Sequence, residues 1–176
     1  MSWFALALVG PDRPGIVAGA TAALAELKCS LEDVSTTILR GHFAMVMVLT
    51  APSTASAPTL RAAVERRLQG IGVNVEVWPA DAAPAPVAAT HVLTAHGEDR
   101  IGIVAGLSGV LAEAGANICE MACLVDDAGD LRSYVVALEV AVPAGVDPDE
   151  LSERLQATAT SLGLKLSIAA VQEEVL

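Results

Sequence analysis

Aromatic residues are scarce in this sequence: two Trp, one Tyr and two Phe make up 3% of its 176 residues. A hydrophobic core must therefore be built from aliphatic side chains, and much of the 53% hydrophobic content is alanine. Only 18% of the residues are charged, and the mean hydropathy is +0.55. A chain this apolar has more hydrophobic surface than one small core needs, so we expect interfaces to cover part of it.

Basic residues are also few, with 10 Lys and Arg against 21 Asp and Glu and a formal net charge of −11. The densest basic group is Arg61, Arg66 and Arg67, on one expected helix. Nucleic-acid binding requires a basic surface that neutralises phosphates. The sequence therefore excludes direct nucleic-acid binding.

Cysteine occurs only three times, as Cys29, Cys119 and Cys123. An odd count without framework spacing indicates a reducing compartment, and we expect a cytoplasmic protein. Cys119 and Cys123 are four residues apart, which on a strand places them on one face. They form either a redox or metal pair, or two small buried hydrophobes. No His or second Cys pair supports a metal site, so we favour the second interpretation.

No apolar run approaches the 18 residues of a membrane-spanning helix. Residues 1–9 are apolar but lack a basic region and a small-residue cleavage site, so we predict a strand there and not a signal peptide. Catalytic patterns are missing too: the sequence has no nucleophile with elbow glycines, no metal-ligand spacing and no phosphate loop with lysine. We therefore predict a protein that is not an enzyme and has no metal, cofactor or membrane partner.

What the sequence does contain is a repeat. Residues 10–19 and 97–106 are identical at eight of ten positions, with an offset of 87 residues. Each copy follows an apolar run and precedes a helical pattern. The repeated piece is therefore a strand, a tight acidic turn and the start of a helix, and such self-similarity indicates a duplicated architecture.

The chemistry of this turn suits a small charged ligand. The first turn of a helix has unpaired N–H groups at the positive end of its dipole, a favourable place for a carboxylate. Gly15 and Gly102 let a ligand approach the backbone, and Asp12 and Asp99 could accept from an ammonium group. The other interpretation is that Asp caps its own helix and Gly only forms the turn. On the motif alone we favour this structural interpretation.

The hydrophobic pattern predicts two units of the same order, β-α-β-β-α-β. We predict a first domain over residues 1–79, a Pro/Ala-rich linker over 80–89 and a second domain over 90–176. Each unit is expected to fold as an α+β, ferredoxin-like sandwich: a four-stranded antiparallel sheet with two helices on one face. The strand patterns at residues 3–9 and 43–49 do not alternate, so the helix-free faces should be covered, by the other unit or by a second chain.

The sequence resembles the ACT domains, small regulatory modules that bind amino acids. The resemblance rests on the predicted element order, the Asp-Arg-x-Gly-Ile-Val turn and residues 115–118 (Gly-Ala-Asn-Ile), which open the second strand of the second unit. It extends over both units. The most similar members are stand-alone tandem proteins of the glycine cleavage system transcriptional repressor type.

The resemblance implies a ligand site between modules, formed by the turn of one module and the second-strand start of its neighbour. Asn117 would supply that strand residue in the second unit, whereas the first unit has the shorter Ser30. His96, one residue before the second turn, is either a further donor or a structural residue. The implied ligand-binding residues are Gly10, Asp12, Arg13, Gly15, Ile16, Ser30, Gly97, Asp99, Arg100, Gly102, Ile103, Asn117 and Ile118.

These observations lead to an amino-acid-binding regulatory protein as the expected function. We expect a homodimer that acts through a regulatory protein partner in amino-acid metabolism or transcription. The alternative is an oligomerisation or scaffold module that has the same fold and binds no ligand.

Overall fold

A computed structural model gives the fold of residues 1–81, 87–126 and 133–171. The chain forms two compact units, residues 1–84 and 85–176. Of the predicted linker at 80–89, residues 82–86 lie outside the described residues. Most of the hairpin turn predicted at residues 126–130, namely residues 127–130, also lies outside the described residues.

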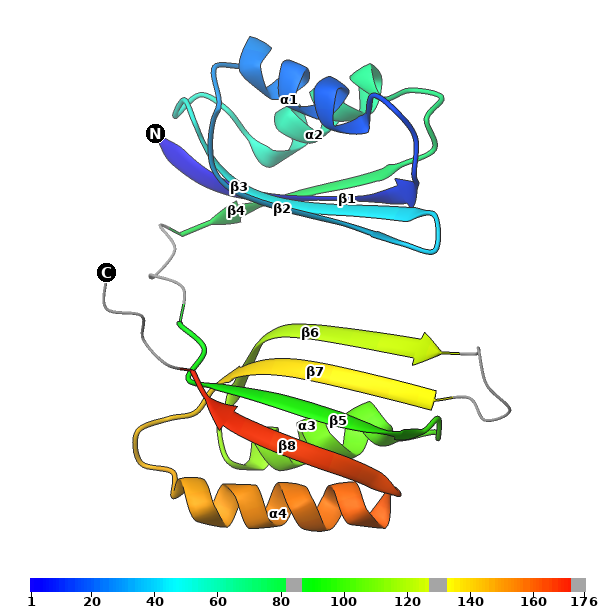
Figure 1. The fold of residues 1–176 in the computed structure, drawn as a ribbon. Helices are drawn as coiled ribbons and strands as arrows, with labels where there is room; N and C mark the ends of the chain where they lie inside the picture. The colour runs from blue at the N-terminus through cyan, green and yellow to red at the C-terminus, as the bar shows by residue number, and fades with distance from the viewer. Residues whose placement is uncertain (82–86, 127–132, 172–176) are drawn as a thin grey trace. The chain divides into compact units, whose positions relative to one another are not determined.

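The first unit is a four-stranded antiparallel sheet, ordered β2-β3-β1-β4, with both helices on one face (Figure 1). Its elements are β1 (Ser2–Pro11), α1 (Ile16–Glu26), β2 (Ser30–Leu39), β3 (His42–Ala51), α2 (Ala57–Arg67) and β4 (Asn74–Ala80).

The second unit repeats this plan, with the order β6-β7-β5-β8. Its elements are β5 (His91–Glu98), α3 (Ile103–Glu113), β6 (Asn117–Asp126), β7 (Ser133–Ala141), α4 (Pro148–Ser161) and β8 (Leu164–Ala170). The predicted tandem of ferredoxin-like α+β units is confirmed.

Local sequence explains where several elements begin. Asp147 caps α4 by accepting from the backbone N–H of Asp149 at 2.9 Å, and Pro148 occupies the first helical position, as predicted. The β2–β3 hairpin has a two-residue loop, Arg40-Gly41, because Leu39 pairs with His42. Both loop residues have positive φ, 48° and 80°, which identifies the type I′ turn that matches the twist of the strands.

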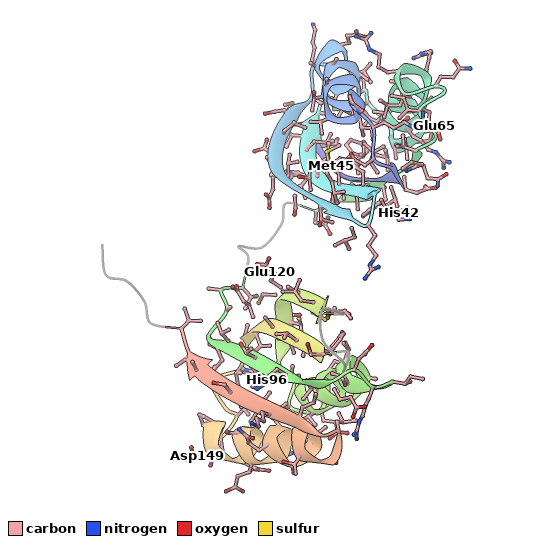
Figure 2. The ribbon with its side chains drawn as sticks, turned by 45° about the vertical axis from the view of Figure 1, so that its right-hand side comes forward. His42, Met45, Glu65, His96, Glu120 and Asp149 are labelled. Atoms are coloured by element: carbon pink, nitrogen blue, oxygen red, sulfur yellow. The ribbon has the colours of Figure 1, made fainter. Side chains whose placement is uncertain are left out.

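Each unit has its own core between the sheet and its two helices. In the first unit β1 and β3 alternate, and every second side chain is buried, including Leu6, Leu8 and Met45 (Figure 2). In the second unit Leu93, Leu107 and other aliphatic side chains fill the equivalent space. Both cores are therefore mainly aliphatic, and the first also contains Phe4 and Phe43.

The helix-free faces of the two sheets differ. On the first sheet this face holds Trp3 and Trp78, and Val46 and Val9 are 51% and 50% exposed. On the second sheet the outer positions combine aliphatic side chains, such as Val92, Leu124 and Val135, with polar ones. The polar ones are Thr94, His96, Glu120, Glu139, Lys165 and Ser167. The same face of the first sheet also holds the polar side chains of Asp33, Ser35 and Thr37 on β2. The expectation that the helix-free faces are covered stays a prediction.

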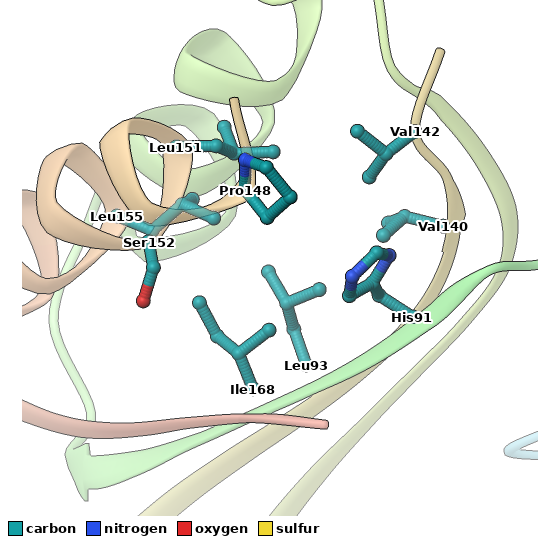
Figure 3. Close-up of a pocket in the computed structure, with 9 residues that line it drawn as sticks. All are labelled: His91, Leu93, Val140, Val142, Pro148, Leu151, Ser152, Leu155 and Ile168. Atoms are coloured by element: carbon teal, nitrogen blue, oxygen red, sulfur yellow. The ribbon is translucent and has the colours of Figure 1, made fainter. Parts of the chain in front are cut away.

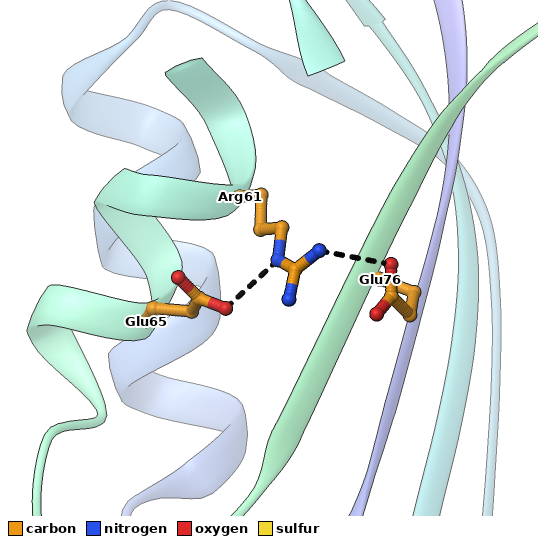
Figure 4. Close-up of polar contacts among 3 residues, drawn as sticks. All are labelled: Arg61, Glu65 and Glu76. Atoms are coloured by element: carbon orange, nitrogen blue, oxygen red, sulfur yellow. Dashed lines mark hydrogen bonds and ion pairs between the residues drawn. The ribbon is translucent and has the colours of Figure 1, made fainter. Parts of the chain in front are cut away.

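An ion-pair network joins α2 to the edge strand of the first sheet (Figure 4). Arg61 Nε donates to Glu65 Oε1 at 2.8 Å, and its Nη1 donates to Glu76 Oε2 at 3.2 Å. The hydrogen bond to Glu65 and the charge of Glu76 raise the pKa of Arg61. Glu76 on β4, at the margin of the helix-free face, is thereby matched with a cation.

Candidate functional site

The repeated turn forms a corner between the first strand and first helix of each unit. We call residues 10–16 the first corner and residues 97–103 the second corner. The helix-capping residue is a glycine in both, Gly15 with φ 97° and Gly102 with φ 96°. This left-handed conformation strongly favours glycine, and a Cβ at either position would meet nothing within 4 Å. The cap itself therefore has no side chain to occupy the amides of the first helical turn.

The two aspartates have different surroundings in the two corners, and neither is the helix cap. Asp12 is exposed, and its own backbone N–H donates to Gly41 O at 2.9 Å, which ties the first corner to the β2–β3 hairpin. Asp99 is half-buried and close enough to Tyr134 for its charge to act on that hydroxyl. The residue at the cap position is glycine in both units, so the predicted cap by Asp does not occur there.

Gly10 and Gly97 have a structural reason to be glycine. A Cβ on Gly10 would lie 2.8 Å from Val73 Cα and 2.9 Å from Gly72 O. A Cβ on Gly97 would lie 2.7 Å from Gly163 O. These contacts are with backbone that leads into the last strand of each unit, so the two glycines are required for packing whether or not a ligand binds.

The other predicted corner residues are arranged unequally. Ile16 and Ile103 are 1% and 3% exposed and belong to the cores, so only their backbone N–H groups can face a ligand. Arg13 is exposed. Arg100 donates to Glu98 Oε2 at 2.9 Å, and its guanidinium packs over Gly163 at the end of α4. Arg100 therefore has a structural use in the second unit.

Two residues that the sequence analysis did not assign to the site lie at the second corner. Tyr134 is directly opposite Gly97 in the β5–β7 ladder, and its hydroxyl hydrogen-bonds the Cys123 thiol. That bond, followed by burial and the charge of Asp99, raises the pKa of Tyr134 to about 12. In the first unit Phe43 is opposite Gly10. Sequence reasoning missed Tyr134 because its place opposite the repeated glycine is known only when the strand register is known.

Asn117 and Ser30 lie at the other end of their sheets. In the second unit the corner end of β5 pairs with Ser133, whereas Asn117 pairs with Ala141, eight residues further along β7. At about 3.3 Å per residue, this separation is roughly 26 Å. Ser30 is equally far from the first corner, because Pro11 pairs with His42 and Ser30 with Thr50. A corner and a second-strand start of the same unit therefore cannot share one ligand.

The remaining predicted residue, Ile118, is half-buried against the second core. His96 is exposed and pairs with Val135 and Lys165 on the helix-free face, away from the start of α3. It is therefore not positioned to donate to a ligand at the helix amides.

The interpretation of Cys119 and Cys123 as buried hydrophobes is wrong, because both are exposed. They lie on β6, an edge strand whose side chains point largely into solvent. A bulge between Ile118 and Glu120 also interrupts the alternation at Cys119. Within residues 1–81, 87–126 and 133–171, no cluster of three or more His, Cys, Asp or Glu could hold a metal.

The edge strands of each sheet are protected to different degrees. β4 and β8 have seven residues each and contain Pro79 and Lys165, respectively, which discourage pairing with another strand. β2 and β6 have ten residues each and contain neither Pro nor Lys. All of β2 is exposed, including Ile38 at 56% and Leu39 at 67%. Both long edges carry a bulge and acidic side chains, so they are only partly protected against pairing with another strand.

An enclosed cavity in the second unit lies between α4 and the sheet (Figure 3). The space open to the centre of a water molecule is about 20 Å³. The cavity therefore has room for one water molecule and is too small for an amino acid. It is lined by His91, Leu93, Val140, Val142, Pro148, Leu151, Ser152, Leu155 and Ile168. No helix in the described part of the chain is long and apolar enough to cross a membrane.

The fold and the duplicated corner define a tandem of βαββαβ modules, and comparison with known proteins identifies the family. The ACT domain model matches residues 4–77. A UPF0237 protein from Methanopyrus kandleri is 41% identical over 75 residues, 42% of this chain and 83% of that protein. One from Lactococcus lactis is 44% identical over 71 residues, 40% of this chain and 79% of that protein. The chain belongs to the ACT domain family.

Two solved structures share the fold across both units. A protein of unknown function from Galdieria sulphuraria has a TM-score of 0.81 at 24% identity, covering 97% of this chain and 99% of that chain. A candidate glycine cleavage system transcriptional repressor has a TM-score of 0.68 at 16% identity, covering 98% of both chains. A phosphoserine phosphatase from Streptomyces coelicolor is 27% identical over 93% of this chain but only 38% of its own length.

Proposed function

We propose that this chain is a regulatory protein that binds a small amino acid at the corner of a module. The observation that carries the proposal is the glycine-capped helix start, which leaves first-turn amides without a cap side chain and with open space at Gly15 and Gly102. The membership of the chain in the ACT domain family supports a regulatory role.

The ligand chemistry follows from the charges at each corner. The α-carboxylate of an amino acid would accept from the helix amides, where the dipole favours an anion. Its ammonium group would lie towards Asp12 in the first corner or Asp99 in the second. One zwitterion would thus contact both groups of a corner, the helix amides through its carboxylate and the aspartate through its ammonium group.

The site would be completed by a neighbouring module. Asn117 lies about 26 Å from the corner of its own unit, by strand rise, so it can reach only the ligand of another corner. Antiparallel pairing of two β6 edges would bring the start of one strand to the end of the other. In a homodimer joined through β6, Asn117 of one copy would therefore approach the second corner of its partner.

The second corner is the stronger candidate of the two. Asn117 offers an amide with both donors and an acceptor, whereas Ser30 offers one short hydroxyl. We therefore expect one tighter and one weaker class of site. The proposal assigns no catalytic step to either corner.

Ligand binding regulates only if it favours one packing arrangement over another. We propose that the preferred arrangement changes contact with a separate protein, a transcriptional regulator or an enzyme of amino-acid metabolism. The likeness to a candidate glycine cleavage system repressor supports this class of output.

A thermal-shift screen of free amino acids tests the proposal. A ligand that binds only the folded chain stabilises it by about 2.7 kcal/mol at 100 times its Kd, so one or a few amino acids should raise the Tm. Asn117→Ala should remove most of the shift. Asn74→Ala, at the start of β4, is the matched control and should retain it.

A flat response of the wild-type chain to glycine, serine and the branched and aromatic amino acids would reject the sensor. The exposed β2 and β6 edges would then favour the second candidate function, an assembly module that binds no ligand.

A further inference from the structure

The helix-free face of the first sheet has an apolar strip at its centre. We define the strip as the outward side chains from Trp3 to Val9 on β1 and from Ala44 to Val48 on β3, with Trp78 on β4. The alternate side chains of β1 and β3 point towards the helices and form the core. Val9, Val46 and Trp78 are 50%, 51% and 44% exposed, so the strip is accessible. It contains both tryptophans of the chain.

Polar and acidic side chains border the strip on both sides. On β2 the outward side chains opposite β3 include Asp33 and Ser35. The Glu32 carboxylate accepts from the Thr50 hydroxyl at 2.9 Å. On β4 the border is Glu76, which is already matched by a cation from α2. The four strands, which the structure describes in full, contain no Lys or Arg, so the charge along the β2 border is negative.

An exposed apolar patch with a polar border is typical of an interaction site, and the size of this one favours a helix as its occupant. The strip is about 14 Å across at its widest, three strands about 4.8 Å apart, and about 20 Å long from Trp3 to Val9. Its area of about 280 Å² is well below the roughly 800 Å² that each partner contributes to a standard interface. A helix about 10–12 Å across covers 20 Å with about 13 residues.

The relief of the strip runs in the same direction. The central side chains on β1, Ala5 and Ala7, are small, whereas Val48 and Val46 opposite them on β3 and Trp78 on β4 are larger. A helix placed along β1 would therefore lie between two raised margins. An apolar sheet face is stable when another layer buries it. α1 and α2 cover only the opposite face of this sheet (Figure 1).

We propose that the strip is the docking site for an amphipathic helix of a separate protein. The helix would place its apolar stripe along β1 and carry Lys or Arg on the margin that lies against Asp33. Complementary charges at that margin would fix its orientation and restrict the choice of partner. The second sheet has no equivalent strip, because Glu120 and Glu139 lie opposite each other on its helix-free face. The proposal does not depend on ligand binding at either corner.

A synthetic peptide and the tryptophan fluorescence of the full chain test the proposal. The peptide has about 14 residues, enough to span the strip as a helix, with Leu at helical spacing and Lys at the other positions. Both tryptophans lie in the strip, so their emission reports this face alone. We expect a saturable shift of the emission to shorter wavelength. A peptide of the same composition, with the Leu stripe broken, should cause no shift.

Two matched variants locate the binding. Val46→Glu places a carboxylate at the centre of the strip, and its burial under the helix should weaken binding by roughly tenfold or more. Ala137→Glu, at the corresponding position of the second sheet, should bind as the wild type does. Asp33→Asn should weaken binding less, and mainly at low salt. Far-UV circular dichroism establishes that the variants are folded.

Other occupants of the strip give other results. A wild-type dimer that Val46→Glu dissociates in sedimentation velocity would mean that a second copy covers the strip, and would overturn the proposal. Tryptophan emission that neither peptide changes would overturn it too, because the strip would then be covered by another part of the chain. An equal shift with both peptides, or full binding by a folded Val46→Glu chain, would also contradict it.

Discussion

The two units have one backbone plan and differ in the side chains that they present outwards. In the first unit both tryptophans lie on the helix-free face, whose outer positions on β2 are polar, and an exposed Asp12 lies in the corner. In the second unit the helix-free face has no tryptophan and mixes polar with aliphatic side chains, and the corner gathers Asp99, Tyr134 and Cys123. The surplus of apolar surface in the composition is therefore not shared equally.

Comparing the units distinguishes positions where both need the same residue from positions where the residue can differ. Gly10 and Gly97 are fixed by backbone contacts in both units. Outside the repeated corner, outward side chains have diverged, since Thr90 stands at the position of Trp3.

The largest expected effect tests whether the units are independent. Leu6 and Leu93 are equivalent positions, 0% and 2% exposed, each in the core of its own unit. Leu6→Ala or Leu93→Ala should each cost about 2–5 kcal/mol, through lost burial and the cavity left behind. Hydrogen exchange followed by mass spectrometry should show faster exchange in the mutated unit only. Equal acceleration in both units would show that they unfold together.

The second prediction concerns the repeated glycine. Gly97→Ala forces a Cβ against Gly163 O and should destabilise the second unit by about 1–3 kcal/mol, the usual range for overpacking. Gly109→Ala is the control, because a Cβ there meets nothing within 4 Å. It should stabilise α3 by about 0.5–1 kcal/mol. Urea denaturation measures both, and a neutral Gly97→Ala would contradict the packing role.

The fold could be predicted because its signals are local. The repeat at residues 10–19 and 97–106, the cap at Asp147 and the continuous apolar run around Leu6 each depend on a few neighbouring residues. The order of elements then leaves few topologies. The sequence could not separate the two helix-free faces, because that required reading the second unit's strands in their own register.

The candidate site was harder to predict, because it depends on contacts between distant segments. Tyr134 faces Gly97 only after β7 has paired with β5. Cys123 is exposed because β6 is an edge strand, a property of the sheet and not of its own sequence. The use of Arg100 over Gly163 likewise depends on how α4 ends.

Tyr134 offers a pH test of the second corner. It is the only tyrosine, so ultraviolet absorbance at alkaline pH reports its ionisation alone. We expect a midpoint at about 12, because the Cys123 thiol, burial and Asp99 raise its pKa. Cys123→Ala should lower that midpoint.

The direction of the stability change follows from the same shift. Unfolded tyrosine ionises near pH 10, so the contribution of Tyr134 is fully present below about that pH. It is lost as the pH rises through the folded value of about 12. A wild-type midpoint near 10 would contradict the proposed environment of the hydroxyl.

The smallest expected effect distinguishes the units by thiol reactivity. Burial raises the pKa of Cys29 in the first unit, whereas Cys119 and Cys123 in the second are exposed. The thiolate is the reactive form, so alkylation at pH 8 should label Cys119 and Cys123 before Cys29. Peptide mass mapping at timed quenches gives the order, and in urea the three rates should converge. Labelling of Cys29 first in the native chain would mean that the first unit opens more readily than its core indicates.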